Sequence, residues 1–133
     1  MHRITITTRS SVDFTDITRE VQDAVKSIGV DSGVGYVFVL HTTASVIVNE
    51  NADPSVVEDI TAQLDSLAPQ LGNYRHREGN APAHIKTSLI GNSVALPVED
   101  GQLVLGTWQG IFLCEFDGPR TRTVLIKVIP DKA

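Results

Sequence analysis

The residues best suited to chemistry gather in one short segment near the middle of the chain. Its cations and imidazoles are Arg75, His76, Arg77, His84 and Lys86. No other arginine or lysine lies between Ser27 and Pro119. Imidazoles with the carboxylate of Glu78 are typical zinc ligands, and the cations could hold a phosphate or diphosphate. A solvated loop with ordinary charges is the alternative, and the residues alone leave both interpretations open.

His41 supplies a third imidazole. It ends the hydrophobic stretch Tyr36–His41, and strand alternation places it on an apolar face. A histidine there can be a satisfied core residue, but its position before the small polar residues 42–44 favours a site. Nearby, Asp53 is explained as a helix cap, whereas Glu50 has no structural explanation.

A glycine-flanked tryptophan and an inward glutamate form the third group. Trp108 lies in the stretch Gly106–Gly110, whose glycines allow close approach of the backbone to another group. Glu115 falls on the strand face of Ile111 and Leu113, where an unpaired carboxylate is costly. It therefore needs a cation, a metal-bound water or solvent at an interface.

The composition indicates one globular domain over residues 1–133. The apolar fraction is 41%, the charged fraction is 20% and the net charge is −5, which excludes a disordered chain and argues against binding nucleic acid or anionic membranes. Cys114 is the only cysteine, so it forms neither an internal disulfide nor a cysteine zinc cluster, and we expect an inert buried thiol. The sequence shows no signal peptide and no apolar run of membrane-spanning length, which predicts a cytoplasmic protein.

The candidate residues are positioned by alternating strands and helices. Alternating and β-branched stretches predict strands at 4–7, 36–41, 45–49, 93–98, 102–105, 110–116 and 121–129. Helices are predicted from Thr15 or Asp16 to about Ile28, from Asp53 and Pro54 to about Leu67, and as a short piece after Pro82. The second helix is expected to turn Val56, Val57, Ile60, Leu64 and Leu67 inward.

Two turns, at 99–101 and 117–120, predict hairpins between the strands that flank them. Strands that pair antiparallel with their chain neighbours, with helices interspersed, define an α+β protein.

Six stretches resemble, in order along the chain, the YjbQ-like family, which is also labelled secondary thiamine-phosphate synthase. They are residues 41–44, 49–54, 78–80 with 83–86, 88–91, 105–110 and 114–120. The most specific part is Gly-Thr-Trp-Gln-Gly at 106–110 followed by Glu-Phe-Asp-Gly-Pro-Arg at 115–120. Together the stretches span nearly the whole chain.

The resemblance implies a compact α+β domain whose mostly antiparallel sheet curls into a half-barrel with two main helices. It also implies a homotrimer with pockets at the subunit interfaces and a divalent metal, zinc being expected, on His41, His76 and His84. The residues expected to be catalytic are Glu50, Lys86 and Glu115. Those expected to bind substrate are Asn51, Ser88, Trp108 and Gln109.

The activity implied by the resemblance joins a pyrimidine diphosphate to a thiazole phosphate. One alternative is a zinc-dependent hydrolase of another small anion, with Glu50 or Glu115 as the base. Another is a non-catalytic trimer that binds a metal or a metabolite. All three take a small anionic or phosphorylated ligand or a metal, and none involves nucleic acid or a membrane.

Overall fold

The computed structural model describes residues 1–132, and these form eight strands and three helices. The strands are β1 His2–Thr7, β2 Asp13–Asp16, β3 Gly33–Val39, β4 Ala44–Glu50, β5 Ser93–Glu99, β6 Gln102–Leu103, β7 Gln109–Glu115 and β8 Thr121–Pro130. The helices are α1 Thr18–Ile28, α2 Pro54–Leu67 and α3 Ala81–Ile90. All the predicted elements are present, and β2 is an addition that its polar sequence did not indicate.

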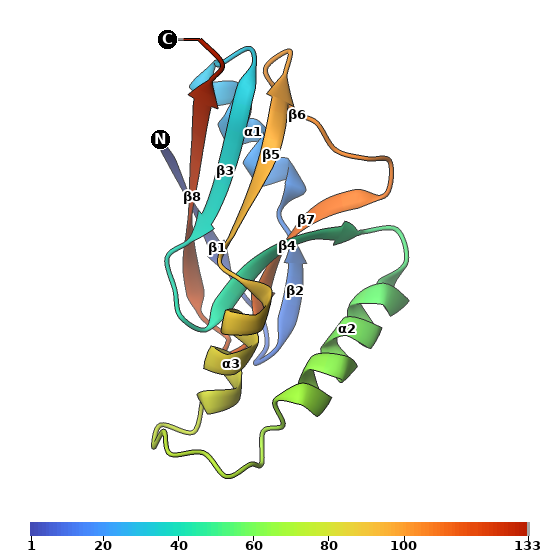
Figure 1. The fold of residues 1–133 in the computed structure, drawn as a ribbon, viewed down its shortest axis with the longest axis vertical. Helices are drawn as coiled ribbons and strands as arrows, with labels where there is room; N and C mark the ends of the chain where they lie inside the picture. Colours follow the sequence, from blue (N-terminus) through green and yellow to red (C-terminus); the bar gives the residue numbers. More distant parts are fainter. Residues whose placement is uncertain (133) are drawn as a thin grey trace.

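The strands form two antiparallel sheets. One has the order β1-β8-β3-β5-β6 and the other has the order β2-β7-β4. Figure 1 shows the long strands of the first sheet at the upper left and the second sheet crossing below them, with α1 behind and α3 beneath. The predicted α+β half-barrel is confirmed, with α3 as a third, shorter helix.

Three of the expected pairings between chain neighbours are wrong. β3 and β4 lie in different sheets, and so do β6 and β7. β7 and β8 are likewise divided, so the turn at 117–120 joins two sheets instead of closing a hairpin. The hairpin at 99–101 is confirmed by the pairing of β5 with β6. Alternation determines which face of a strand is buried, but it does not determine the partner strand, and this is why the prediction failed.

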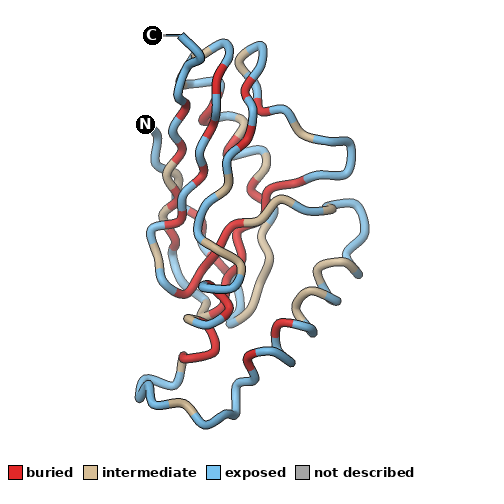
Figure 2. The backbone as a smooth tube through the Cα atoms, in the orientation of Figure 1, coloured by how far each residue is buried: buried red, intermediate tan, exposed pale blue. Residues whose placement is uncertain are grey.

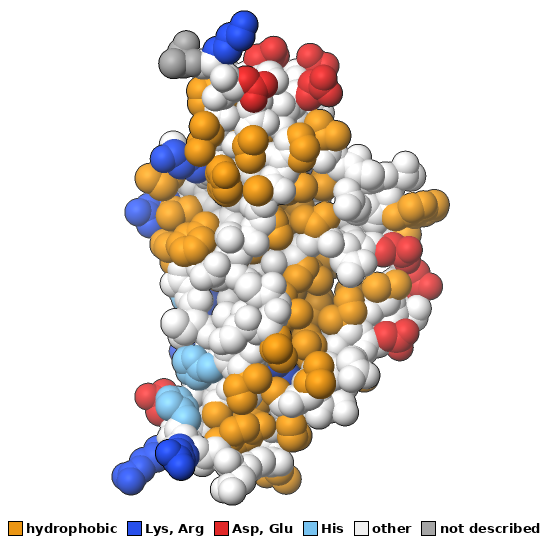
Figure 3. Space-filling view, in the orientation of Figure 1, with side chains coloured by type: hydrophobic (Ala, Val, Ile, Leu, Met, Phe, Trp, Pro, Cys, Tyr) orange, Lys and Arg blue, Asp and Glu red, His pale blue; other side chains and the backbone are white. Residues whose placement is uncertain are grey.

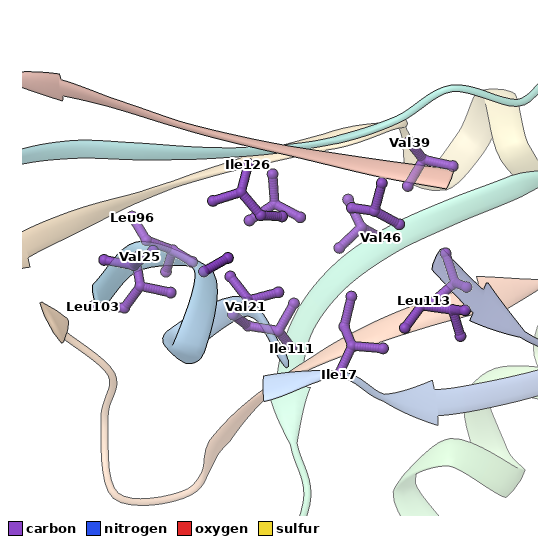
Figure 4. Packing of buried hydrophobic residues seen from close by; sticks show 14 of the residues in the cluster. Ile17, Val21, Val25, Val39, Val46, Leu96, Leu103, Ile111, Leu113 and Ile126 are labelled. Carbon is purple, nitrogen blue, oxygen red and sulfur yellow. The ribbon is translucent and has the colours of Figure 1, made fainter. Parts of the chain in front are cut away.

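The main core lies between the two sheets and α1. Figure 4 shows Val21 and Val25 of α1 packed with Ile111 of β7 and Ile126 of β8. Along β3 of the first sheet, buried and exposed residues alternate (Figure 2), whereas β7 of the second sheet is buried from Gly110 to Glu115. Helix α1 ends at Gly29 as predicted. The φ angle of Gly29 is +79°, a backbone conformation that glycine adopts freely.

Helix α2 lies to one side of the sheets (Figure 1). It begins as predicted, with the Asp53 carboxylate accepting a hydrogen bond from the Ser55 N–H at 2.9 Å and Pro54 in the first turn. Its inward face is narrower than expected, because Leu64 is its only buried residue and Leu67 is exposed. The expected burial of the whole apolar stripe is therefore wrong for the single chain.

Helix α3 packs against β4 and encloses a second, smaller cluster. The cluster contains Leu64, Ala83, Cys114 and Phe116. Cys114 is buried as expected, and burial raises the pKa of its thiol. Within residues 1–132 no helix is both long and apolar enough to cross a membrane.

Candidate functional site: a histidine pocket beside helix α3

Two of the predicted histidines lie next to each other. His84 is on α3 and His76 is in the loop before it, and their ring centroids are 5.2 Å apart in an edge-to-face arrangement. Ser88 lies one turn after His84 and donates its hydroxyl hydrogen bond to the His84 carbonyl at 2.8 Å. Figure 3 shows histidine side chains together with arginine or lysine at the lower left of the molecule.

His41 follows the end of β3 and is held by the backbone of β8. Its Nε2 accepts a hydrogen bond from the Thr123 N–H at 2.8 Å. Burial lowers the pKa of His41, and the positive charge of Arg122 lowers it further. The ring is therefore neutral near pH 7. Since Nε2 accepts a hydrogen bond, the single ring proton is on Nδ1.

His41, Thr42 and His84 line two adjoining hollows, which we call the histidine pocket. One hollow has a volume of about 480 Å³ and the other about 350 Å³, sizes at which proteins bind small molecules. The first is completed by Thr87, Ser88, Gly91 and Asn92. The second is completed by Leu40, Thr43, Glu78, Asn80, Asp117, Arg120 and Arg122.

Two residues that line the pocket each have one buried polar atom without a hydrogen-bond partner among residues 1–132. These atoms are the hydroxyl oxygen of Thr87, a residue that is 8% exposed, and Oδ1 of Asn80. The Asn80 amide nitrogen donates to an Asp117 carboxylate oxygen at 2.9 Å. Buried polar groups in folded proteins are nearly always paired, so these two atoms are exceptions that lie behind the pocket wall.

The accessible cation of the histidine pocket is Arg120. Its Nε donates to the Asp117 carbonyl at 2.7 Å, and its Nη2 lies 3.1 Å from the Asp117 carboxylate. The side chain is about half exposed, so its remaining N–H groups can bind an anion.

Glu115 lies beneath this pocket and is fully buried against Arg122. Burial raises the pKa of Glu115, but hydrogen bonds from Arg122, the Asp117 N–H and Thr8 outweigh it and hold the pKa below its ordinary value. The prediction that Glu115 needs a cation is confirmed. Its carboxylate is occupied by these donors, so the geometry gives it a structural position instead of the catalytic one expected.

Sequence reasoning did not select Arg122, although a signal was present. Arg122 shares its strand face with Val124 and Ile126, so it is a charged residue within an apolar alternation. Glu115 interrupts the face of Ile111 and Leu113 in the same way. Two opposite charges on two inward faces predict a buried pair.

Lys86 does not join the histidines. It lies two residues after His84 on α3, so the two side chains project from different sides of the helix. Its ammonium group pairs with Asp65 of α2 and lies 5.8 Å from the centroid of the Phe116 ring. It lines a separate cavity of about 610 Å³ between α2 and α3.

The remaining expected site residues lie at the opposite end of the second sheet. We call this group the tryptophan end; it comprises Glu50, Asn51, Trp108 and Gln109. Glu50 pairs with Gln109 in the β4–β7 register, and the Asn51 N–H donates to the Trp108 carbonyl at 3.1 Å. Because β4 has seven residues at about 3.3 Å each, about 20 Å separates this end from the histidine pocket.

The predicted zinc ligands are of the right kind, but they are not arranged as a metal site in this conformation. Among residues 1–132 no three histidine, cysteine, aspartate or glutamate side chains are placed to hold one ion. His41 has its Nε2 lone pair engaged by Thr123 and its proton on Nδ1, which leaves no lone pair for a metal.

Comparison with known proteins agrees with this α+β half-barrel. The sequence profile described as "UPF0047 protein YjbQ-like" matches residues 2–131, and the chain belongs to this family. A UPF0047 protein of Methanocaldococcus jannaschii is 47% identical over 127 residues, covering 96% of this chain and 92% of the relative. YugU of Bacillus subtilis, also a UPF0047 protein, is 47% identical over 125 residues, covering 93% and 95%.

Solved structures of the family share the fold. The crystal structure of an uncharacterized conserved protein of the family from Clostridium acetobutylicum superposes with a TM-score of 0.94 at 49% identity, covering 97% of this chain and all of the other. A YbjQ-like protein of unknown function from Sulfolobus solfataricus gives a TM-score of 0.93 at 32% identity, covering 98% and 96%.

Proposed function

We propose that the histidine pocket binds a small phosphorylated substrate and that the protein is a thiamine-phosphate synthase-like transferase. One observation carries the proposal: His41 and His84 line both of two adjoining hollows, and the half-exposed Arg120 lines one of them. Arg120, on the wall of one hollow, supplies a positive charge for a phosphate.

The proposed reaction forms a bond from the thiazole nitrogen to the methylene carbon of the pyrimidine. The bond from that carbon to the diphosphate oxygen breaks, and the diphosphate leaves with the electron pair. Negative charge therefore develops on the leaving group. Arg120 and the Nδ1–H of His41 are the donors suited to stabilise it, and such stabilisation is a large part of catalysis in reactions of this kind.

A divalent metal, with zinc as the first candidate, remains part of the proposal. Zinc would act as a Lewis acid toward the diphosphate. The adjacent rings of His76 and His84 would provide two of its ligands, and a third would have to come from His41 after release from Thr123 or from another copy of the chain. Metal analysis of freshly purified protein tests this: zinc near one ion per chain supports it, and no transition metal overturns it.

A homotrimer is also proposed, and the charge distribution supports it. The tryptophan end lies beside a hollow lined by Asp16, Glu50, Asp53 and Glu58, whereas the histidine pocket has arginine and imidazole besides Glu78 and Asp117. Contact of the acidic end with the half-exposed Arg120 of the next copy would be a head-to-tail association, which forms a ring when the rotation between copies closes. Such a ring would bring the tryptophan end of one copy to the histidine pocket of the next. Light scattering after size exclusion would report three chains, and a monomer would overturn this part.

The activity test uses purified protein and the two phosphorylated precursors. We expect thiamine phosphate to form, and we expect His84→Ala to lower the rate about a hundredfold, within the range for loss of a positioned polar group. His2→Ala, at an exposed position near the N-terminus, is the matched control. No product from the wild type, or an unchanged rate in His84→Ala, would overturn the proposal. A cytoplasmic location remains a prediction from the sequence.

A further inference from the structure

The ion pair between Glu115 and Arg122 is the most deeply buried charged group that the proposed reaction does not use. The side chains are 0% and 3% exposed, and they come from β7 and β8, which belong to different sheets. One carboxylate oxygen accepts from Thr8 at 2.7 Å and from Arg122 Nε at 2.8 Å. The other accepts from the Asp117 N–H at 3.0 Å and from Arg122 Nη2.

Stability alone does not explain this pair. Desolvation of two charges offsets most of their attraction, so an apolar pair of similar volume is often as stable or more stable. The surroundings are already apolar, with Ile111, Leu113 and Val124 on the same inward faces. The pair therefore matters for the backbone segments that it holds in place.

The pair holds one wall of the histidine pocket through Arg122. Its Nη2 donates to the Thr43 carbonyl at 3.2 Å and to the Thr43 hydroxyl at 2.9 Å. Thr43 closes the short connection that carries His41. The next residue of β8, Thr123, donates its N–H to His41. Arg122 therefore contacts the connection that carries His41 and directly precedes the residue whose N–H binds the imidazole.

The pair holds the opposite wall through Glu115. The carboxylate binds the Asp117 N–H directly, and it binds Thr8, whose hydroxyl accepts the Arg120 N–H at 2.9 Å. The approach is close: a Cβ at Gly118 would lie 2.7 Å from Glu115 Cγ, so only glycine fits there. The backbone segments on both sides of the second hollow are therefore hydrogen-bonded, directly or through Thr8, to one ion pair.

We propose that Glu115 and Arg122 are positioning residues that fix the His41 tautomer and the placement of Arg120. The role of the pocket in this inference rests on the proposed function. The contacts that Glu115 and Arg122 make around the pocket do not depend on it. The fork of Arg122 is essential to it, because a single guanidinium reaches both Glu115 oxygens and Thr43. A lysine at this position keeps the charge but cannot make these contacts together.

The test compares Arg122→Lys with Arg3→Lys, the same change at an exposed position of β1 in the same sheet. Two readouts are used: the ¹⁵N shifts of the His41 ring, and the dissociation constant for inorganic diphosphate. In Arg122→Lys we expect the shifts of one tautomer to be replaced by tautomer-averaged shifts. We expect diphosphate binding to weaken about tenfold, as for a slightly misplaced site. Arg3→Lys should change neither.

Unchanged His41 shifts in folded Arg122→Lys would overturn the positioning role. If Arg122→Lys does not fold, Thr43→Val removes the hydroxyl acceptor and keeps the branched shape, and the same two readouts apply. Failure of the proposed function can be told apart from failure of the positioning role. If the proposed function is wrong, wild-type protein binds no diphosphate. The His41 shifts still decide whether the ion pair positions the ring.

Discussion

The two ends of the β4–β7 pair have opposite characters. At one end Ala44 pairs with Glu115, and the carboxylate is fully buried, ion-paired and covered by the histidine pocket. At the other end Glu50 pairs with Gln109, beside a Trp108 that is 64% exposed. The same two strands therefore have a buried, ion-paired carboxylate at one end and an exposed tryptophan at the other.

This difference shows which predicted site residues can act together in one chain. The histidine pocket has preorganised donors, unpartnered polar atoms and a cation, and these are features of a binding site. The tryptophan end has exposed groups about 20 Å away along the strands, beyond the reach of one small ligand. It can contribute to the same site only from another copy of the chain.

The largest expected effect contrasts the two glutamates. Glu115→Leu leaves Arg122 buried without a partner and should lower the free energy of unfolding by about 3–5 kcal/mol, whereas Glu50→Leu should change it by less than about 0.5 kcal/mol. Urea denaturation monitored by circular dichroism measures both. The double variant Glu115→Leu with Arg122→Met should recover most of the loss. Equal effects at the two ends would contradict the comparison.

The next largest effect should be on anion binding, which should distinguish the histidine pocket from the tryptophan end. Arg120→Gln should weaken binding of inorganic diphosphate about tenfold, because a charge-assisted contact is lost. Glu50→Gln should change the dissociation constant less than Arg120→Gln does, and Lys86→Gln, whose side chain lines the cavity between α2 and α3, should leave it unchanged. Isothermal titration calorimetry gives the constants. A larger loss in Lys86→Gln than in Arg120→Gln would move the anion site to the cavity between α2 and α3.

Lowering the pH should remove the stability that Glu115 contributes at the histidine pocket. The pKa of Glu115 is depressed in the folded protein, so its contribution to stability is present above the usual glutamate pKa of about 4.3 and is lost as the pH falls through the folded pKa. Denaturation curves between pH 6 and pH 3 should therefore show a smaller loss in the double variant Glu115→Leu with Arg122→Met than in wild type. A loss of the same size in both would show that Glu115 titrates normally.

The smallest expected effect on folding is at Trp108. Because the side chain is mostly exposed, Trp108→Ala should change the stability of the single chain by less than about 0.5 kcal/mol. If the tryptophan end contacts another copy, the same variant should dissociate at higher protein concentrations than wild type. Light scattering across a dilution series measures this, and an unchanged dissociation profile would remove Trp108 from the interface.

Local patterns in the sequence predicted much of the fold but not how the sheets assemble. The cap at Asp53, the stop at Gly29 and the 99–101 hairpin follow from local chemistry, and each is confirmed. The division of β7 and β8 between two sheets depends on long-range packing, which alternation does not encode.

The candidate site was predictable in its residue types and less so in its arrangement. His41 and His84 were predicted as metal ligands; the structure places both at one pocket, and the metal role stays a prediction. Lys86 was grouped with them although the helical period already separates its side chain from that of His84. The Arg122 partner of Glu115 was missed although each charge interrupts an apolar strand face; the fold shows that the two strands, from different sheets, bring them together.

The central claim is that anions bind at the histidine pocket and not at the tryptophan end. A titration of ¹⁵N-labelled protein with inorganic diphosphate, followed by amide chemical shifts, tests it most directly. We predict that the largest changes fall at His41, Thr87 and Arg120, with only smaller changes at Glu50 and Trp108. Changes centred on Glu50 and Trp108, or no saturable change at all, would contradict it.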